Sequence, residues 1–309
     1  MANKEIVCSY CKSKGIVCSY CKSKEIVKRG FIHTKITGKR QRYYCKSCNR
    51  KFIPKDAFYR MRNSPQKITC ALDLFFRGLS TRAVQSHFQA FFPHNSDHST
   101  ILRWIRKFSL KIANFTDNLK INSGSYAEVD EMEYHRRKSH KQKRGAEVNW
   151  FIDSIDVKTR FMVASKYAKH RSKAELRKVL HGLKNKAENV RIVTTDGLTA
   201  YENLVKKIWG YNRHIRNYNI QHKVVTQSKG DGFNIWVERI HNTLRQRTKT
   251  FRGFHGSVES AYAIMKGLEI YYNFIRKHEA LKGKTPSEIA LPNLKFETPN
   301  RWLELINLS

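Results

Sequence analysis

Apolar and polar residues alternate with two different periods along the second half of the chain. Runs with strand-like alternation, such as "SYAEVDEMEY" and "NWFIDSIDVKTRFMVASKY", are followed by a helical pattern in "SKAELRKVLHGLKNKA" and by another apolar strand in "VRIVTTDG". Strands and helices in alternation predict an α/β core. The stretch "INSGS", residues 121–125, comes before this region and predicts a linker.

Three helical patterns precede the linker, between residues 64 and 116. Pro65 marks the first start, Gly78 to Ser80 form a break and a cap, and Ser96 or Asp97 caps the third helix. Three short helices with a tight break predict a helix-turn-helix unit. A plain three-helix packing module would show the same periodicity and stays open as the alternative.

The third helix has an apolar stripe and a separate polar face. The apolar residues at helical spacing are Ile101, Ile105, Phe108 and Ile112. Thr100, Arg103 and Lys107 project from another face near the start of the helix. These three side chains are therefore candidate DNA contacts, to phosphates or in the major groove.

Six of the seven cysteines form three Cys-x-x-Cys pairs within the first 48 residues, and the segment Ile6–Lys14 is repeated letter for letter as residues 16–24. The second and third pairs flank strand-like residues on both sides of a Thr37-Gly38 turn, which is the outline of a zinc ribbon. The second copy of the repeat continues directly into the hairpin. The favoured ligands of a structural Zn²⁺ are therefore Cys18, Cys21, Cys45 and Cys48.

Two alternatives accompany this zinc site. Cys8 and Cys11 could pair with Cys45 and Cys48 instead, although we expect them to lie in a duplicated flexible tail that can still exchange into the site. A redox or disulfide pair lacks a thioredoxin-like sequence context. Cys70 lies in an apolar helical pattern, so we expect its side chain to pack in the core and not to bind metal or react.

The charge balance limits the classes of molecule that the chain is expected to bind. The chain carries 60 Lys and Arg against 25 Asp and Glu, a net charge of +35, which indicates a polyanionic partner such as nucleic acid. Residues 1–64 alone carry 17 basic and 3 acidic side chains, so the ribbon is expected to contact phosphate as well. The sequence contains neither a run of about 18 apolar residues nor a basic segment leading into an apolar stretch at the N-terminus, so we expect a soluble intracellular protein.

Two carboxylates occupy positions suited to chemistry. Asp130 lies inside the first strand of the α/β region, and Asp196 ends a later strand, where such sheets present side chains to a ligand. Glu238 lies in a basic helix and, taken alone, could simply form an ion pair. Alternation along the first strand puts Glu128 on the face of Asp130, and Glu131 and Glu133 on the opposite face.

Other acids compete for such a role. Asp153 and Asp156 flank a strand end, and Asp156 in "DVKTR" is typical of a turn former. Asp231 in "KGDGF" suits a loop cap. Position alone does not separate these acids from catalytic ones.

Four stretches together carry a family resemblance: "EVDE", "TTDGLTAY", "WVERIHNTLRQRTKTFRGF" and "YYNFIRKHEALKGKTPSEIA". They resemble the DDE transposases of prokaryotic insertion sequences, whose catalytic core is ribonuclease H-like. The resemblance implies that Asp130, Asp196 and Glu238 are the catalytic residues and bind Mg²⁺. The nearby Arg239, Arg245 and Lys249 are then candidate DNA contacts.

The chemistry of phosphodiester attack agrees with this resemblance. Two divalent ions about 3.5–4 Å apart can activate the attacking oxygen and stabilise the leaving one. Carboxylate oxygens suit Mg²⁺ or Mn²⁺, whereas the thiolates suit Zn²⁺. The sequence thus separates a structural metal from two catalytic ions.

The resemblance implies a DNA transposase that binds the terminal inverted repeats of an element, cleaves DNA and joins the released 3′ hydroxyl to target DNA. We expect a homo-oligomer on double-stranded DNA, because two ends need two active sites. A DNA-binding regulator without catalysis, and a ribonuclease H-like nuclease or resolvase, are the alternatives. The expected location is the cytoplasm of a prokaryotic host, associated with the nucleoid.

The expected fold is an α/β ribonuclease H-like catalytic core preceded by a small zinc ribbon and an all-α helix-turn-helix module. The expected parts are a duplicated tail at 1–17, the zinc ribbon at 18–60, the helix-turn-helix at 64–116, a linker at 117–125, the core at 126–290 and a C-terminal tail at 291–309.

Overall fold

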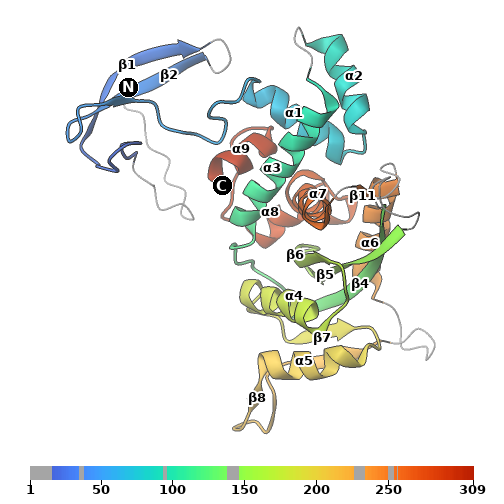
Figure 1. Cartoon of the computed structure of the whole chain (residues 1–309). Coiled ribbons are helices and arrows are strands. Elements are labelled where there is room, and N and C mark those ends of the chain that lie inside the picture. The colour runs from blue at the N-terminus through green and yellow to red at the C-terminus, as the bar shows by residue number, and fades with distance from the viewer. Residues whose placement is uncertain are drawn as a thin grey trace. The chain divides into compact units, whose positions relative to one another are not determined.

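The computed structural model describes residues 16–34, 38–92, 96–137, 146–225, 234–249, 254–255 and 257–309. Its chain divides into two compact units, one formed by residues 1–71 with 296–308 and the other by residues 72–295 with 309. Figure 1 labels most of the helices and strands of both units. Within the described ranges, every helix is too short or too polar to span a lipid bilayer.

The first unit contains a three-stranded antiparallel sheet of β1 (Ile26–Thr34), β2 (Gly38–Cys45) and β3 (Lys51–Phe52). Its small core consists of Cys18, Cys45 and Phe52, with Ile26 and Tyr43 packed against them. A core of this size stabilises little by itself. The sheet therefore needs another source of stability, and the cysteines are placed to supply it.

Residues 291–309, expected as a tail, contain the helix α9 (Arg301–Leu308) with Trp302, Leu305 and Ile306 buried. The Asn300 side-chain amide, just before this helix, donates a hydrogen bond to Thr69 Oγ1 at 2.9 Å. The C-terminal segment thus folds with the first unit, which the sequence pattern did not indicate.

The second unit is built on a mixed sheet with the order β10-β7-β4-β5-β6, in which β11 also pairs with β4. The strands β4 (Tyr126–Arg137), β5 (Ala146–Asp156) and β6 (Met162–Ala168) pair in antiparallel fashion, and β6 forms one edge of the sheet. The strands β7 (Ile192–Thr195), β10 (Gln221–Val224) and β11 (Phe254–His255) are parallel to their neighbours. The mixed α/β core expected from the sequence is confirmed.

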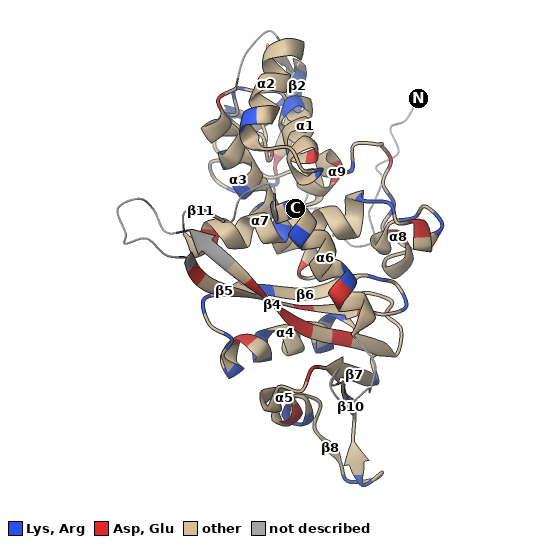
Figure 2. Ribbon diagram, turned by 90° about the vertical axis from the view of Figure 1, so that its right-hand side faces the viewer, with Lys and Arg blue, Asp and Glu red and all other residues tan. Residues whose placement is uncertain are grey.

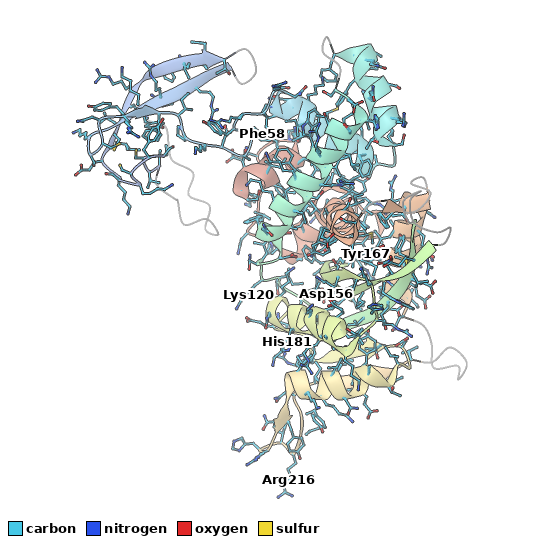
Figure 3. The ribbon with its side chains drawn as sticks, viewed as in Figure 1. Phe58, Lys120, Asp156, Tyr167, His181 and Arg216 are labelled. Carbon is cyan, nitrogen blue, oxygen red and sulfur yellow. The ribbon has the colours of Figure 1, made fainter. Side chains whose placement is uncertain are left out.

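Helices cover both faces of this sheet (Figure 1). One face carries α4 (Lys173–Lys186) and α5 (Thr199–Trp209), and the other carries α6 (Ile235–Lys249) and α7 (Val258–Ile270). The unit also contains a short hairpin of β8 (Tyr211–Asn212) and β9 (Asn217–Tyr218). After α7 it contains a π-helical turn (Tyr271–Ile275), a 3-10 turn (Glu279–Leu281) and α8 (Pro286–Ala290). Tyr167, labelled in Figure 3, is buried and packs edge-on against Phe254.

The three helices predicted before the core are α1 (Pro65–Phe76), α2 (Thr81–Phe91) and α3 (His98–Thr116). The Ser80 side chain caps α2 and the Asp97 side chain caps α3, each by accepting a backbone N–H, which confirms the predicted caps. The stripe of Ile101, Ile105, Phe108 and Ile112 is fully buried, as expected.

Helices α2 and α3 belong to the same compact unit as the sheet instead of standing apart from it. Gly267 of α7 approaches α3 and the end of α1 so closely that a β-carbon would overlap Ser109 of α3 and Phe76 of α1. The expected linker, residues 117–125, is likewise fixed, since the Gly124 N–H donates to Asp156 Oδ1 at 2.8 Å. Periodicity located these helices but could not show what their apolar faces cover.

Candidate active site

The parallel pairing of β4 with β7 places two predicted residues side by side. Tyr126, Ala127 and Glu128 of β4 pair with Ile192, Val193 and Thr194 of β7. Asp130 and Asp196 each lie two residues beyond the last of these pairs. The same register therefore brings both carboxylates to the point where β7 ends.

A third carboxylate joins them. One carboxylate oxygen each from Asp130, Glu131 and Asp196 lies within 4.8 Å of the other two. Acidic positions lie along the strands of this sheet, as Figure 2 marks in red. Three carboxylates held this close repel one another unless protons or cations compensate them.

The open edge of β4 explains why Glu131 belongs to this group. Glu131 lies on the face of α5, opposite to Asp130 as alternation predicts, and Tyr201 of α5 is beside it. Because β7 pairs with β4 only as far as Glu128, the Glu131 N–H is left outside the ladder and donates to Asp130 Oδ1 at 2.8 Å. Asp130 thus turns toward the strand edge, where carboxylates from the two faces meet.

Asp196 is held by the start of the next helix. Its Oδ1 accepts the Leu198 N–H at 3.1 Å, one residue before α5 begins. Aspartate side chains commonly accept a backbone N–H two residues ahead in turns of this kind. It fixes the carboxylate at the edge of the sheet without using its second oxygen.

Glu238 is not among the three grouped carboxylates, although the family resemblance placed it with Asp130 and Asp196. It lies in the first turn of α6, and its charge acts on Glu128. Glu128 Oε2 accepts the N–H groups of Trp236 and Val237 at 2.8 and 3.0 Å. A strand carboxylate thus caps α6 and fixes the end of the helix that carries Glu238.

A buried histidine on α6 faces the same strand pair. His241 Nε2 lies 2.6 Å from Asp153 Oδ1, and its Nδ1 lies 3.7 Å from Asp130 Oδ2. Burial opposes the charged form of His241, but the adjacent Asp153 outweighs it and raises the pKa of the imidazole. Sequence reasoning missed His241, although its position three residues after Glu238 puts both on one helix face.

The competing acids have structural roles or lie elsewhere. Asp156 accepts the Thr159 N–H at 2.9 Å, which confirms it as a turn former, and it is labelled in Figure 3. Asp153 is the fully buried partner of His241. Asp231 lies outside the described residues.

The predicted DNA contacts are mostly on the surface. Arg103 and Lys107 on α3 are exposed, Thr100 is half-buried, and the Arg103 guanidinium donates to Thr100 Oγ1 at 2.8 Å. Arg239 and Arg245 on α6 are exposed too, and Arg239 lies over the Trp236 ring. The side chain of Lys249 lies outside the described residues.

The donor set fits a hard divalent cation. Both carboxylate oxygens of Glu131 are buried without a hydrogen-bond partner, and the nearest cation described is the Arg171 guanidinium, 3.7 Å away. Oxygen donors in such a cluster are the ligands that Mg²⁺ and Mn²⁺ prefer. Asp130, Glu131 and Asp196 could therefore hold such an ion.

The four ribbon cysteines fit Zn²⁺ by the same kind of test. Their Sγ atoms lie within 4.8 Å of one another, with Cys18 to Cys48 at 3.6 Å and Cys21 to Cys45 at 3.5 Å. A tetrahedron with Zn–S bonds of about 2.3 Å has edges of about 3.8 Å. All four are free thiols, whereas Cys8 and Cys11 lie outside the described residues.

Binding of Mn²⁺ should weaken at lower pH. Burial raises the pKa of Asp130 to about 6 and that of Glu131 to about 7, and the neighbouring carboxylates add to both shifts. A carboxyl group with a raised pKa keeps its proton below that pKa, and the proton must leave before a cation binds. Calorimetric titration should show affinity falling at least about tenfold from about pH 7.5 to about pH 5.5. Equal affinities would show that these groups do not bind the ion.

No family model matches the sequence, and no curated protein matches it either. Among 54 matching chains of solved structures is the HTLV-2 integrase catalytic core domain in complex with magnesium, at 15% identity over 54% of this chain and 97% of that chain, with a TM-score of 0.34.

Two further structures have similar scores. The simian T-cell lymphotropic virus intasome in complex with the PP2A regulatory subunit B56 gamma matches at 12% identity over 76% of each chain, with a TM-score of 0.36. The Drosophila P element transposase strand transfer complex matches at 14% identity over 54% of this chain and 42% of that chain, with a TM-score of 0.35. At scores this low, the likenesses decide nothing about the function of this chain.

Proposed function

We propose that this chain is a DNA transposase of the prokaryotic insertion-sequence type. The observation that carries the proposal is the group of Asp130, Glu131 and Asp196 at the point where β7 ends beside β4, with oxygens within 4.8 Å of one another. The net charge of +35 supports a nucleic-acid substrate. The four clustered ribbon thiols are consistent with an accessory DNA-binding unit whose fold is stabilised by Zn²⁺.

Each residue of the site has a defined task in this proposal. Asp130 and Asp196, with Glu131 beside them, hold Mg²⁺ or Mn²⁺, and Glu238 on α6 completes the set for two ions. When bound, the ions supply activation of the attacking oxygen and stabilisation of the leaving oxygen on phosphate. His241 and Asp153 hold Asp130 in place, and Glu128 holds the start of α6.

The remaining surface residues bind DNA in this proposal. The helices α1 to α3 act as a helix-turn-helix, with Thr100, Arg103 and Lys107 contacting the terminal inverted repeats. Arg239, Arg245 and Lys249 contact the phosphates of the DNA near the carboxylates. Two chains act together, because two element ends need two sets of carboxylates.

Joining of DNA distinguishes this function from the alternatives. Labelled DNA carrying the inverted repeats that flank the gene is incubated with the chain, a supercoiled plasmid and Mg²⁺. A transposase should give labelled ends covalently joined to the plasmid. Cleaved ends without joined products would identify a nuclease or resolvase, and binding without cleavage would identify a regulator.

A further inference from the structure

The first unit has a groove of about 510 Å³ that the proposed catalytic chemistry does not use. It lies between the Cys18–Cys21 loop, the strands β2 and β3, and the turn that follows β3. Its lining residues are Ser19, Tyr20, Arg42, Lys51, Phe52, Ile53, Lys55, Tyr59 and Arg60. A volume of this order is typical of sites for small organic groups, and a nucleotide is of that size.

Two aromatic rings in the groove are open to solvent. Tyr20 is 56% exposed and Tyr59 is 37% exposed, although tyrosine rings bury favourably. Tyr20 projects from the loop between Cys18 and Cys21, so the cysteine cluster fixes its backbone. Phe52, buried beneath, and the half-buried Ile53 form an apolar floor.

The charges around the rings are of one sign. Arg42, Lys51, Lys55 and Arg60 line the groove, and no carboxylate lines it. Of the acids near the strands, Asp56 pairs with Arg40 at 2.7 Å and Glu25 accepts from the Ser47 hydroxyl at 2.8 Å. Among the ion pairs of the described chain, none neutralises these four lining cations, so the groove favours an anion.

The rim of the groove is tied to the sheet. The Arg40 guanidinium donates to the Pro54 carbonyl at 3.0 Å, and the Asp56 carboxylate accepts the Phe58 N–H at 3.0 Å. Phe58, labelled in Figure 3, is buried and directly precedes Tyr59 in the chain. Cations already lie over both rings, Arg50 at 5.1 Å from Tyr20 and Lys55 at 5.7 Å from Tyr59.

From these observations we infer that the groove binds an unpaired segment of a single nucleic-acid strand, with its bases stacked on both Tyr20 and Tyr59 and its phosphates on the four lining cations. Exposed aromatic rings interleaved with Lys and Arg are how proteins bind single strands. In a duplex, neighbouring base pairs cover the faces of each base, so these rings would gain nothing. The inference does not depend on the catalytic carboxylates, since none of them contributes to the groove.

The test measures binding of fluorescent oligonucleotides by the full chain. Tyr20→Ala and Tyr59→Ala should each weaken binding of a single-stranded oligothymidine by about 5- to 100-fold, as loss of one stacked base does. Binding of a duplex of the same length should change less than about twofold in both variants. Oligodeoxyuridine and oligouridine, which differ only in the 2′-hydroxyl, tell DNA from RNA as the source: tighter binding of the deoxy strand identifies DNA, tighter binding of the ribo strand identifies RNA, and equal binding identifies recognition through base and phosphate alone.

A matched control lies in the same unit. Phe31 is 53% exposed, has the Lys39 ammonium 4.1 Å from its ring, and does not line the groove. Phe31→Ala should leave single-strand binding unchanged, and zinc content confirms that Tyr20→Ala keeps its cysteine cluster. If Tyr59→Ala binds single strands like the wild type, or if Phe31→Ala weakens binding equally, the groove is not the site. Equal losses for single and double strands would also overturn the inference, and point to duplex phosphate contacts instead.

Discussion

Replacing Asp196 with Asn should lower the rate of Mg²⁺-dependent DNA cleavage by about 10³-fold or more. The amide has nearly the size of the carboxylate and can still accept the Leu198 N–H, so the turn before α5 is retained. What is lost is a negative charge within 4.8 Å of Asp130 and Glu131. Asp130→Asn should have an effect of the same order. Both are measured on labelled element ends.

The control is Glu188→Gln, which removes an exposed carboxylate that pairs with Lys120. This surface ion pair contributes little to stability, so cleavage should stay at the wild-type rate. An Asp196→Asn chain that is folded and still cleaves at more than about a tenth of the wild-type rate would contradict the assignment of this residue.

Glu131 and Glu238 compete for the place of the third carboxylate, and a pair of variants separates them. Glu238→Gln should cost as much cleavage as Asp196→Asn does, because the proposal uses Glu238 to complete the set for two ions. If Glu238→Gln cleaves normally whereas Glu131→Gln does not, the three grouped carboxylates are the whole site and the assignment of Glu238 is wrong.

The second large effect concerns the structural metal. Cys18→Ser combined with Cys21→Ser should reduce bound zinc from about one ion per chain to nearly none and open the first unit to proteolysis. The reason is that the sheet β1 to β3 has a core of only three buried residues, two of which are Cys18 and Cys45. Zinc is measured by mass spectrometry of the purified chain.

The duplicated pair supplies the matched control for this experiment. Cys8→Ser combined with Cys11→Ser removes the same number of thiols from an identical segment, yet zinc should remain bound. Loss of zinc from this variant, with retention in the Cys18 and Cys21 variant, would exchange the assignment of the two copies.

The sequence predicts the parts of this molecule better than their assembly. Helix caps at Ser80 and Asp97 and the α/β pattern follow from local rules, and the structure confirms them. The four-cysteine group follows from spacing, because each Cys-x-x-Cys pair supplies two neighbouring corners of a tetrahedron. The helix α9 at the C-terminus, by contrast, depends on burial of Trp302 and Leu305, which a short pattern does not reveal.

In the acidic site, too, some residues could be predicted from local sequence and others depend on how the strands and helices assemble. Asp130 and Asp196 could be found from their positions on strands, and the structure brings them together. Glu131 could not, because alternation alone separates it from Asp130, and only the early end of the pairing with β7 opens the edge. His241 needed the observation that α6 packs over β4 and β5, which no local pattern encodes.

The most direct test of the proposed site is calorimetric titration of Mn²⁺ at about pH 7.5, above the raised pKa values of Asp130 and Glu131. It needs no knowledge of the DNA sequence that the chain acts on. The wild-type chain should bind Mn²⁺ with measurable heat, whereas a folded chain carrying both Asp130→Asn and Asp196→Asn should not. Binding of equal affinity and stoichiometry in the double variant would show that these carboxylates are not a metal site, and the proposed function would lose its main support.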